Sequence, residues 1–501
     1  MRKLIAALST IVLSTTCLSS IPHASATTPI KWVTCPEQVT APGSQCGEIE
    51  VPMDYTQPTG EKITIGFVKR NATGSARGAL FGNPGGPSGD AYTYVGNTNT
   101  FNWPESITGE WDFIGVQPRG LPGSTPIQCN VGAASSSDMI QPGAFVRNNC
   151  AQPYANNITT ENTARDWEEV RKALGYKNIS ILGLSYGTIL GSTYATLFPE
   201  HTDKLVLDSG IDPQLMWAGI MAAQEQGYIN SLHEFLNYVA AHDDTYHLGT
   251  TALAVYQSWS NKVVAETGTN PTVAPPPAQI GDVPPALGQF GADALTAINP
   301  TIVQAKGLGS QILSGGRANQ VNSPTLLLTR QLLPMRSSWN ALAEIIAGTK
   351  EIPQVQPTEE QIVTASQHQI MQSVIICNEA VSPTNPMEYP RYVWLNFITG
   401  DVFSAPSAAV SSGASCAGAA PITSVEISGA GLATRPLQLQ ATGDPQTPYA
   451  HWGSMAEKMG SHVVTVHGSG HGTVGLGFPH IDNIAADYLR TGTTEVTEVS
   501  F

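Results

Sequence analysis

Beyond its first 26 residues, the 501-residue sequence has no long hydrophobic run. A transmembrane helix needs roughly 18 or more consecutive apolar residues, and no later stretch of the sequence reaches that length. We therefore expect no integral membrane segment once the amino-terminal segment has been removed.

Positive charge is also scarce, because 24 Lys and Arg residues stand against 39 Asp and Glu residues and give a net charge of −15. Removal of the first segment takes away Arg2 and Lys3 with no acidic residue and lowers the net charge to −17. Such an acidic chain is repelled by phosphate backbones and anionic lipids. The composition therefore argues against nucleic acid as a partner.

Metal-binding patterns are missing as well. The sequence has no CxxC or HExxH motif, and no cysteine stands at ligand spacing from a histidine. We expect no metal site and no cofactor, and we expect the histidines of the central region to be ordinary surface or core residues. They are His233, His242, His247 and His368.

The amino-terminal segment has the pattern of an export signal. Arg2 and Lys3 precede the apolar run Leu4–Leu13, and the small residues Ala24–Ala26 follow as a cleavage site. Residues 1–26 are therefore predicted to be a signal peptide, and the mature protein is predicted to be secreted or associated with the cell envelope.

Six cysteines follow the signal segment, and an even number in an exported chain favours disulfides. Their order suggests pairing between neighbours, although other pairings remain open. The predicted pairs are Cys35–Cys46, Cys129–Cys150 and Cys377–Cys416.

Short apolar, mostly β-branched runs alternate with turns and helical patterns, which is typical of a doubly wound, mainly parallel sheet in an α/β fold. Helical spacing is found at Glu161–Leu174 and Thr188–Phe198. The predicted strands are Glu48–Pro52, Lys62–Lys69, Ala79–Phe81, Asp112–Val116, Ile179–Leu182, Lys204–Leu207, Pro436–Ala441 and His462–Val466.

A long central stretch interrupts this alternation and contains helical segments at Gln224–Ala240 and Ser337–Ala347. Gly268–Gly288 is rich in Pro and Gly and is predicted to be an irregular connection. We expect a sheet domain in two parts, residues 27–211 and 433–501, with a mostly helical cap inserted at residues 212–432.

A GxSxG motif, Gly183–Gly187, lies between a predicted strand and a predicted helix. In this position a serine is exposed on a sharp strand-to-helix turn, as in hydrolases of the α/β-hydrolase fold. Serine needs a neighbouring base and an acid to become a nucleophile. The motif therefore predicts a serine hydrolase with Ser185 as the nucleophile.

The chain order in such hydrolases is serine, then an acid, then histidine. Asp444 and His471 each follow a predicted strand late in the sequence and are the predicted acid and base. Asp208 is a rival acid, but we expect it to hold the turn before Asp212. His467 is a rival base, for which we expect a structural role.

A Gly-rich loop, Asn83–Pro87, follows an early strand, where these hydrolases place one wall of an oxyanion site. Pro87 has no N–H, so the predicted donors are the backbone N–H groups of Gly86 and Tyr186. An ordinary Gly/Pro turn is the alternative.

Taken together, these motifs resemble the secreted tripeptidyl aminopeptidases of actinobacteria, relatives of the prolyl iminopeptidases, over nearly the whole chain. The segments that carry the resemblance are Trp32–Cys35, Cys46, Val51–Tyr55, Asn83–Pro87, Gln117–Gly120 with Cys129, Ser185–Gly187, Tyr194–Pro199, Val206–Asp208, Cys377–Glu379, Asp444–Pro448 and Gly470–Gly472.

The resemblance implies release of short peptides, such as tripeptides, from free amino ends, and a cap that limits substrate length. A free amino group needs a carboxylate partner, and Glu379 is the first candidate, with Glu225 second. Ser88 and Gln117 depart from the residues that are common in relatives, and we expect both departures to reshape the substrate cleft.

Two other functions remain open. An esterase for acyl esters of the cell envelope would use the same three catalytic residues, and the cap would decide between them, since a carboxylate site favours a peptidase and a wholly apolar cavity favours an esterase. A non-catalytic envelope-binding protein is the second alternative, against which the intact Ser185, Asp444 and His471 argue.

Overall fold

A single mixed β-sheet forms the centre of the protein. The computed structural model describes residues 28–130, 142–352, 358–380, 385–417 and 422–501, and the predicted signal segment lies outside them. Within these residues the sheet has ten strands in the order β1-β2-β3-β5-β4-β6-β7-β8-β9-β10. The strands are β1 (Lys31–Val33), β2 (Gln45–Pro52), β3 (Lys62–Arg70), β4 (Ala79–Asn83), β5 (Asp112–Val116), β6 (Ile179–Leu184), β7 (Thr202–Asp208), β8 (Leu437–Ala441), β9 (His462–His467) and β10 (Glu498–Ser500).

The sheet has an antiparallel part and a parallel part. Strands β1, β2, β3 and β5 pair antiparallel with one another, and from β5 onward each neighbouring pair is parallel. The carboxyl ends of β4, β6, β7, β8 and β9 therefore meet at one edge, where open α/β sheets bind their ligands. The predicted α/β fold class is confirmed, whereas β1 and β10 were missed because both are three-residue strands without a clear apolar pattern.

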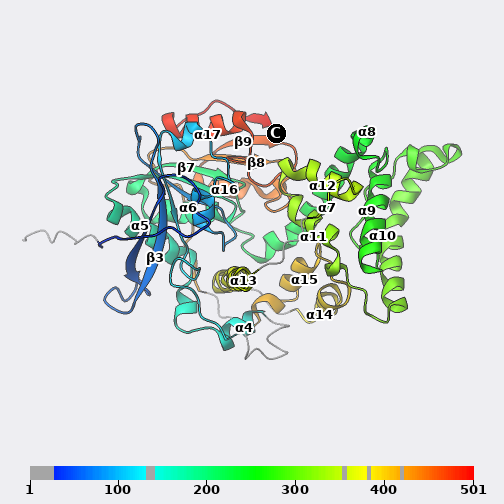
Figure 1. Cartoon of the computed structure of the whole chain (residues 1–501), viewed down its shortest axis with the longest axis horizontal. Helices are drawn as coiled ribbons and strands as arrows, with labels where there is room; N and C mark the ends of the chain where they lie inside the picture. The colour runs from blue at the N-terminus through cyan, green and yellow to red at the C-terminus, as the bar shows by residue number, and fades with distance from the viewer. Residues whose placement is uncertain (1–27, 131–141, 353–357, 381–384, 418–421) are drawn as a thin grey trace, which may run out of the picture.

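Alternation along the strands gives the sheet two buried faces. Leu80, Leu182 and Val206 belong to one apolar cluster, and their chain neighbours Phe81, Ile181 and Leu205 belong to the other. The first face is covered by α1 (Ala91–Gly96), α2 (Glu105–Thr108) and α17 (Pro479–Thr491), and the second by α5 (Thr160–Leu174), α6 (Tyr186–Leu197) and α16 (Gly453–Met459). Figure 1 shows this layered core with the sheet between its helices.

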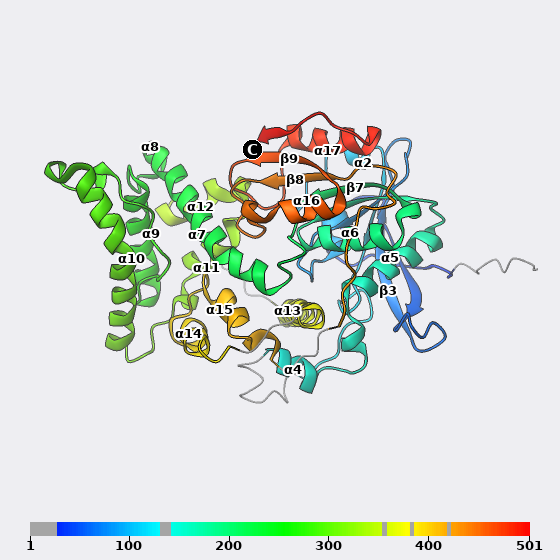
Figure 2. The ribbon, with the colours of Figure 1, turned by 180° about the vertical axis from the view of Figure 1, so that it is seen from behind.

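Between β7 and β8 the chain leaves the sheet and forms mainly helices, which stand beside the core in both views (Figures 1 and 2). Trp259, Trp339 and Phe235 centre a separate apolar cluster there. The helices are α7 (Ala218–Ala241), α8 (Asp243–Tyr246), α9 (Ala252–Thr267), α10 (Gly288–Leu313), α11 (Pro324–Leu332), α12 (Trp339–Ala347), α13 (Glu359–Glu379), α14 (Tyr389–Val393) and α15 (Ala405–Ser411).

Some of these helices were not expected from the sequence. Helices α7 and α12 contain or match predicted segments, but α9, α10 and α13 were not identified. Helix α10 continues through Pro300, a residue that normally ends or kinks a helix because it lacks an N–H. The Pro- and Gly-rich connection before α10 holds only short turns of 3₁₀ helix, at Ile280–Asp282 and Pro285–Leu287.

Three disulfides join the cysteines in the pairing of chain neighbours: Cys35–Cys46, Cys129–Cys150 and Cys377–Cys416. The third connects the end of α13 to the short turn Ala414–Cys416. It therefore links two parts of the helical insertion covalently.

A buried ion pair holds the antiparallel end of the sheet against α5. Arg119 and Asp166 have side chains that are 0% and 1% exposed and meet through bonds of 2.7 and 2.8 Å. The same guanidinium donates to the Met53 carbonyl oxygen at 2.8 Å, and the Tyr55 hydroxyl donates to Asp166 at 2.8 Å. Each charge therefore has several partners, as a buried pair requires.

Replacement of Arg119 by Leu is expected to lower the free energy of unfolding by about 3–5 kcal/mol, because Asp166 would remain buried without a counter-charge. Urea denaturation followed by circular dichroism measures the change. Arg77→Leu is the control, since Arg77 pairs with Glu110 at the surface and should cost less than about 1 kcal/mol. Equal effects of the two substitutions would contradict this interpretation.

Candidate active site

Ser185 occupies a sharp turn between β6 and α6. Its backbone has φ 58° and ψ −121°, a conformation that is unusual for a residue with a side chain. A Cβ atom at Gly183 would collide with the carbonyl oxygen of Gly187, and one at Gly187 would collide with the carbonyl oxygen of Asn83. The two glycines of the motif are therefore required for the backbone to pass this closely.

Asp444 and His471 lie together at the ends of β8 and β9. The Asp444 carboxylate lies 2.9 Å from Nδ1 of His471 and also accepts from the N–H of Gln446 (2.8 Å) and the hydroxyl of Thr447 (2.7 Å). Asp444 is 2% exposed. The carboxylate is thus fixed by donors on several sides and can hold the imidazole in one orientation, with Nε2 free for a proton.

The loop that carries His471 is also held by the insertion. The backbone N–H of His471 donates to the carbonyl oxygen of Pro334 at 2.7 Å. Pro334 follows α11, so the candidate base takes its position from both parts of the protein. No feature of the local sequence pointed to this contact.

The structure gives Asp208 a different role from the one expected. Instead of holding the turn before Asp212, its buried carboxylate accepts from the N–H groups of Thr473 (2.8 Å) and Val474 (3.0 Å). Burial raises the pKa of Asp208 to about 6, against the opposing effect of these N–H donors. Asp208 therefore fastens the loop that follows His471, as does Ser209, whose hydroxyl accepts from the Gly472 N–H at 2.8 Å.

The Gly-rich loop lies directly against the Ser185 turn. Gly85 and Gly86 have φ of 93° and 112°, and a Cβ atom at Gly85 would contact Ser185 and Tyr186. Within the described part of the chain, the N–H groups of Gly86 and Tyr186 donate to no other group. Both N–H groups are thus available to a ligand, and their role as donors to an oxyanion stays a prediction.

Helix α13 of the insertion contacts this loop through two side chains one helical turn apart. His368 Nδ1 lies 2.5 Å from the Ser88 carbonyl oxygen, and Gln372 donates to the Gly86 carbonyl oxygen at 3.1 Å. His368, expected to be an ordinary surface or core residue, therefore supports the candidate oxyanion loop. A spacing of four residues on one helix was the available signal, but it is common.

Ser185 and His471 line one cleft of about 440 Å³, here called the Ser185 cleft. Among the described residues that line the cleft there is no aspartate or glutamate, and Asp444 itself is buried. Its polar lining includes Gln224, Arg330 and Gln372. Gln117 was expected to reshape the cleft but lies outside it, buried between the Ala91 N–H and the Pro122 carbonyl oxygen.

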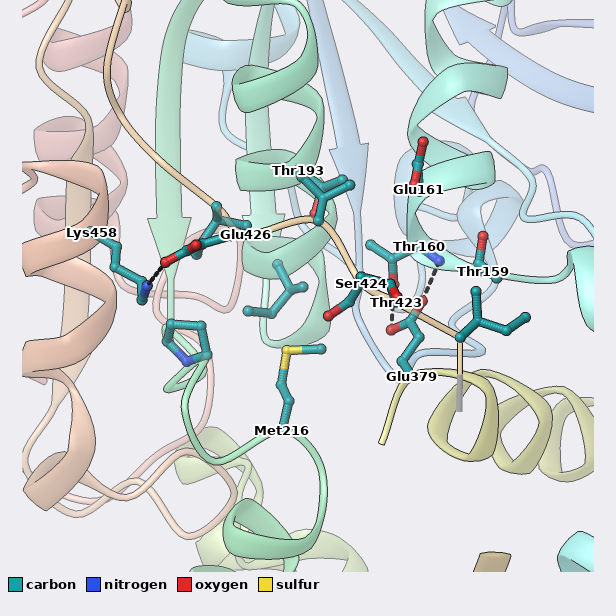
Figure 3. A pocket seen from close by; sticks show the side chains of 15 residues that line it. Thr159, Thr160, Glu161, Thr193, Met216, Glu379, Thr423, Ser424, Glu426 and Lys458 are labelled. Carbon is teal, nitrogen blue, oxygen red and sulfur yellow. Dashed lines mark hydrogen bonds and ion pairs between the residues drawn. The ribbon is translucent and has the colours of Figure 1, made fainter. Parts of the chain in front are cut away.

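Glu379, the first candidate for amine recognition, lines a second cavity of about 230 Å³, here called the Glu379 cavity. Its carboxylate accepts from the N–H and the hydroxyl of Thr160, as Figure 3 shows, and Thr423 and Ser424 lie close by. Burial raises the pKa of Glu379 to about 7. A cationic partner would therefore stabilise the ionised form of this carboxylate.

Glu225 is already paired, because both of its oxygens accept from Arg391 at 2.8 and 3.0 Å. Its charge is neutralised, so we do not retain it as an amine ligand. His467 is half exposed and faces Glu498 at the end of β9, and it does not line the Ser185 cleft.

The described residues offer neither a metal-binding cluster nor a membrane-spanning helix. No group of three or more His, Cys, Asp or Glu side chains within the described ranges could hold a metal ion. Among the helices that the structure describes, none combines the length and apolar character of a membrane span.

Two family models match the sequence. The model of the alpha/beta hydrolase fold covers residues 82–358, and the model of TAP-like proteins covers residues 403–500. These matches and the fold define a serine hydrolase of the α/β-hydrolase fold. The chain belongs to the alpha/beta hydrolase fold family, and its last part, residues 403–500, is similar to TAP-like proteins.

Individual relatives differ in how much of the chain they match. The chain is 34% identical to the tripeptidyl aminopeptidase of Streptomyces lividans over 256 residues, which are 46% of this chain and 48% of the relative. It is 28% identical to the serine protease Hip1 of Mycobacterium tuberculosis over 93% of this chain and 89% of the relative. It is 26% identical to carboxylesterase B of the same species over 91% of this chain and 86% of the relative. The match to the tripeptidyl aminopeptidases therefore spans about half of their length.

We expect Ser185→Ala to abolish labelling by a fluorophosphonate probe, which requires a nucleophilic serine. His471→Ala should slow labelling by about 10²- to 10⁴-fold, the usual contribution of a general base. His467→Ala is the matched control and should label at the wild-type rate. Labelling that survives Ser185→Ala would refute the proposed nucleophile.

Asp208→Ala is expected to lower kcat by about 10- to 100-fold on a short acyl ester, because the His471 loop loses its anchor and small displacements are costly. KM should change little, since Asp208 does not line the cleft. Asp208→Asn keeps an acceptor oxygen and should be less affected. Asp203→Ala, on the exposed part of the same strand, is the control. Wild-type kcat in Asp208→Ala would contradict the positioning role.

Proposed function

We propose that this protein is an exported serine peptidase that releases short peptides, such as tripeptides, from free amino ends through an acyl-enzyme on Ser185. The observation that carries the proposal is Glu379, a partly buried carboxylate that lines a cavity and is linked through Thr160 to Tyr186, the residue after Ser185. A carboxylate in this position suits the ammonium group of a substrate.

The chemistry follows from the arrangement of the site. Ser185 Oγ attacks the scissile carbonyl carbon while His471 Nε2 takes its proton, and Asp444 stabilises the resulting imidazolium. The N–H groups of Gly86 and Tyr186 stabilise the oxyanion. His471 then gives the proton to the leaving amine as the C–N bond breaks, and water releases the acyl group by the same steps in reverse order.

The position of Glu379 suggests how substrate length would be set. Thr160 Oγ1 lies 2.9 Å from Glu379 and 2.8 Å from the hydroxyl of Tyr186, the residue after Ser185. Glu379 is thus separated from the nucleophile turn by one tyrosine side chain and two hydrogen bonds. Three extended residues span about 10 Å, a comparable length. An ammonium bound at Glu379 would place the third peptide bond near Ser185.

Trp217 stands between the two sites. It lines the Ser185 cleft, whereas its neighbour Met216 lines the Glu379 cavity, and the two spaces share no lining residue. The indole N–H of Trp217 makes no hydrogen bond of normal geometry. It lies near enough to the Glu379 carboxylate to lower the pKa of that group. We propose that a substrate displaces this indole and that its ammonium group replaces the indole N–H.

An esterase is the second candidate. The full-length similarity to carboxylesterase B and the absence of an acidic residue from the described lining of the Ser185 cleft favour it. The cleft is not wholly apolar, however, because three glutamines and an arginine line it. A polar cleft beside a partly buried carboxylate supports the peptidase more strongly than the esterase.

Export is part of the proposal. The signal pattern of residues 1–26 supports it, as do the three disulfides, which persist mainly in oxidising compartments.

We expect Glu379→Gln to lower kcat/KM for a tripeptide anilide with a free amino end by about 10- to 100-fold, the range for hydrogen bonds to charged groups. The N-acetylated anilide and a short acyl ester should be unaffected. Glu161→Gln is the matched control, because Glu161 lines the same cavity but pairs with Arg165.

The pH dependence provides a second readout. Glu379 binds an ammonium group when ionised, so the ratio of kcat/KM for the free to the acetylated substrate should rise as pH increases through about 7. It should fall again where the amino group loses its proton, near pH 8. The ratio removes every pH effect that the two substrates share. Turnover of the ester alone would establish the esterase instead.

A further inference from the structure

Arg330 is a cation in the Ser185 cleft without an ionic partner. It lies on α11 and lines the cleft together with Ser185 and His471. Among the described residues, no carboxylate forms a salt bridge with it, and its only hydrogen bond runs from Nε to the Val402 carbonyl oxygen at 3.2 Å. The two terminal nitrogens of the guanidinium therefore keep their N–H groups for a ligand.

The side chain is held in place by an aromatic ring. The guanidinium stacks on the face of Tyr228 from α7, and α7 and α11 lie side by side in both views (Figures 1 and 2). The hydroxyl of Tyr228 accepts from Gln446 at 2.7 Å, and the Gln446 N–H donates to Asp444. Arg330 is thus connected through two residues to the acid of the candidate triad.

The helix that carries Arg330 is itself firmly anchored. Glu266 of α9 accepts from the hydroxyl and the N–H of Thr325 in the first turn of α11, at 2.5 and 3.2 Å. Farther along α11, the hydroxyl of Thr329, next to Arg330, accepts from the indole N–H of Trp259 at 3.0 Å. The guanidinium therefore projects from a rigid support, as a specificity-determining residue requires.

Partial burial of the Arg330 guanidinium without a counter-charge carries a desolvation cost. Burial lowers the pKa of Arg330 to about 9, and no nearby carboxylate offsets that effect. A charge removed from water is normally paired. In the free protein the desolvation of Arg330 is not offset, and an anionic ligand would offset it. Arginine binds carboxylates through two parallel N–H···O bonds, which gives direction as well as affinity.

We propose that Arg330 forms an anion subsite of the Ser185 cleft and binds a carboxylate of the substrate. This inference rests on the proposed function, since it names the class of substrate that the cleft prefers. The carboxylate has two sources, an acidic side chain in the acyl part of a peptide or the carboxyl end of a short leaving peptide. In both cases the recognising group is the guanidinium.

The first test compares substrates that differ only in charge. Tripeptide anilides with Glu or Gln at each position probe the acyl side, and tetrapeptides with a free or amidated carboxyl end probe the leaving side. Wild-type protein should prefer the acid in one of the two arms by about 10- to 100-fold in kcat/KM. Equal kcat/KM for acid and amide in both arms would overturn the proposal.

Variants assign the preference to Arg330. Arg330→Gln should bring the acid-to-amide ratio close to one, and Arg330→Lys should retain part of it, because lysine keeps the charge but not the two-pronged geometry. Arg336→Gln is the matched control, since Arg336 also stacks on aromatic rings of the insertion but does not line the cleft. A preference that persists in Arg330→Gln would overturn the assignment.

A binding measurement separates this inference from the proposed function. Glutarate and its neutral diamide are compared as competitors of fluorophosphonate labelling in the wild-type protein, which needs neither a variant nor peptide turnover. Protection by glutarate alone, with no hydrolysis of any peptide, would support the anion subsite and refute the peptidase. Equal protection by both compounds, or by neither, would refute the anion subsite.

Discussion

The arrangement of the site depends on the end of β7, where Asp208 joins three segments that are far apart in the sequence. Its carbonyl oxygen accepts from the Ser185 N–H at 2.9 Å, while its carboxylate accepts from the loop after His471. The next residue, Ser209, donates its N–H to Leu439 of β8 at 2.9 Å. One strand end thus sets the positions of the nucleophile turn and the histidine loop relative to each other.

The core of this arrangement could be predicted because its signals are local. Strand runs, the GxSxG turn and the two late strand ends each lie within a few residues of the features that define them. In the structure Ser185 and His471 line one cleft and Asp444 contacts His471, while their catalytic roles stay a prediction. The role of Asp208 could not be predicted in the same way, since its partner Thr473 lies 265 residues farther along the chain. A strand-end aspartate followed by a turn gives the same local pattern whether it holds its own turn or a distant loop.

The helical insertion was the less predictable part for the same reason. Glu379 was singled out through a resemblance, but its contact with Thr160 spans 219 residues. Arg330 gave no signal at all, because an arginine near the end of a helix usually faces solvent. Only the folded structure shows that Arg330 stacks on Tyr228 of α7 and lines the Ser185 cleft. The insertion therefore contributes Arg330 to the Ser185 cleft and Glu379 to the Glu379 cavity.

The contact between Pro334 and His471 has a consequence for attempts to re-engineer this protein. A cap is often regarded as a removable cover whose deletion would widen access for larger molecules. Here the backbone N–H of His471 donates to the Pro334 carbonyl oxygen of the insertion, and α13 contacts the Gly-rich loop through His368 and Gln372. A truncated enzyme would lose supports of its own base and oxyanion loop along with the barrier. Broader substrate range is therefore better sought by reshaping individual side chains than by excising the insertion.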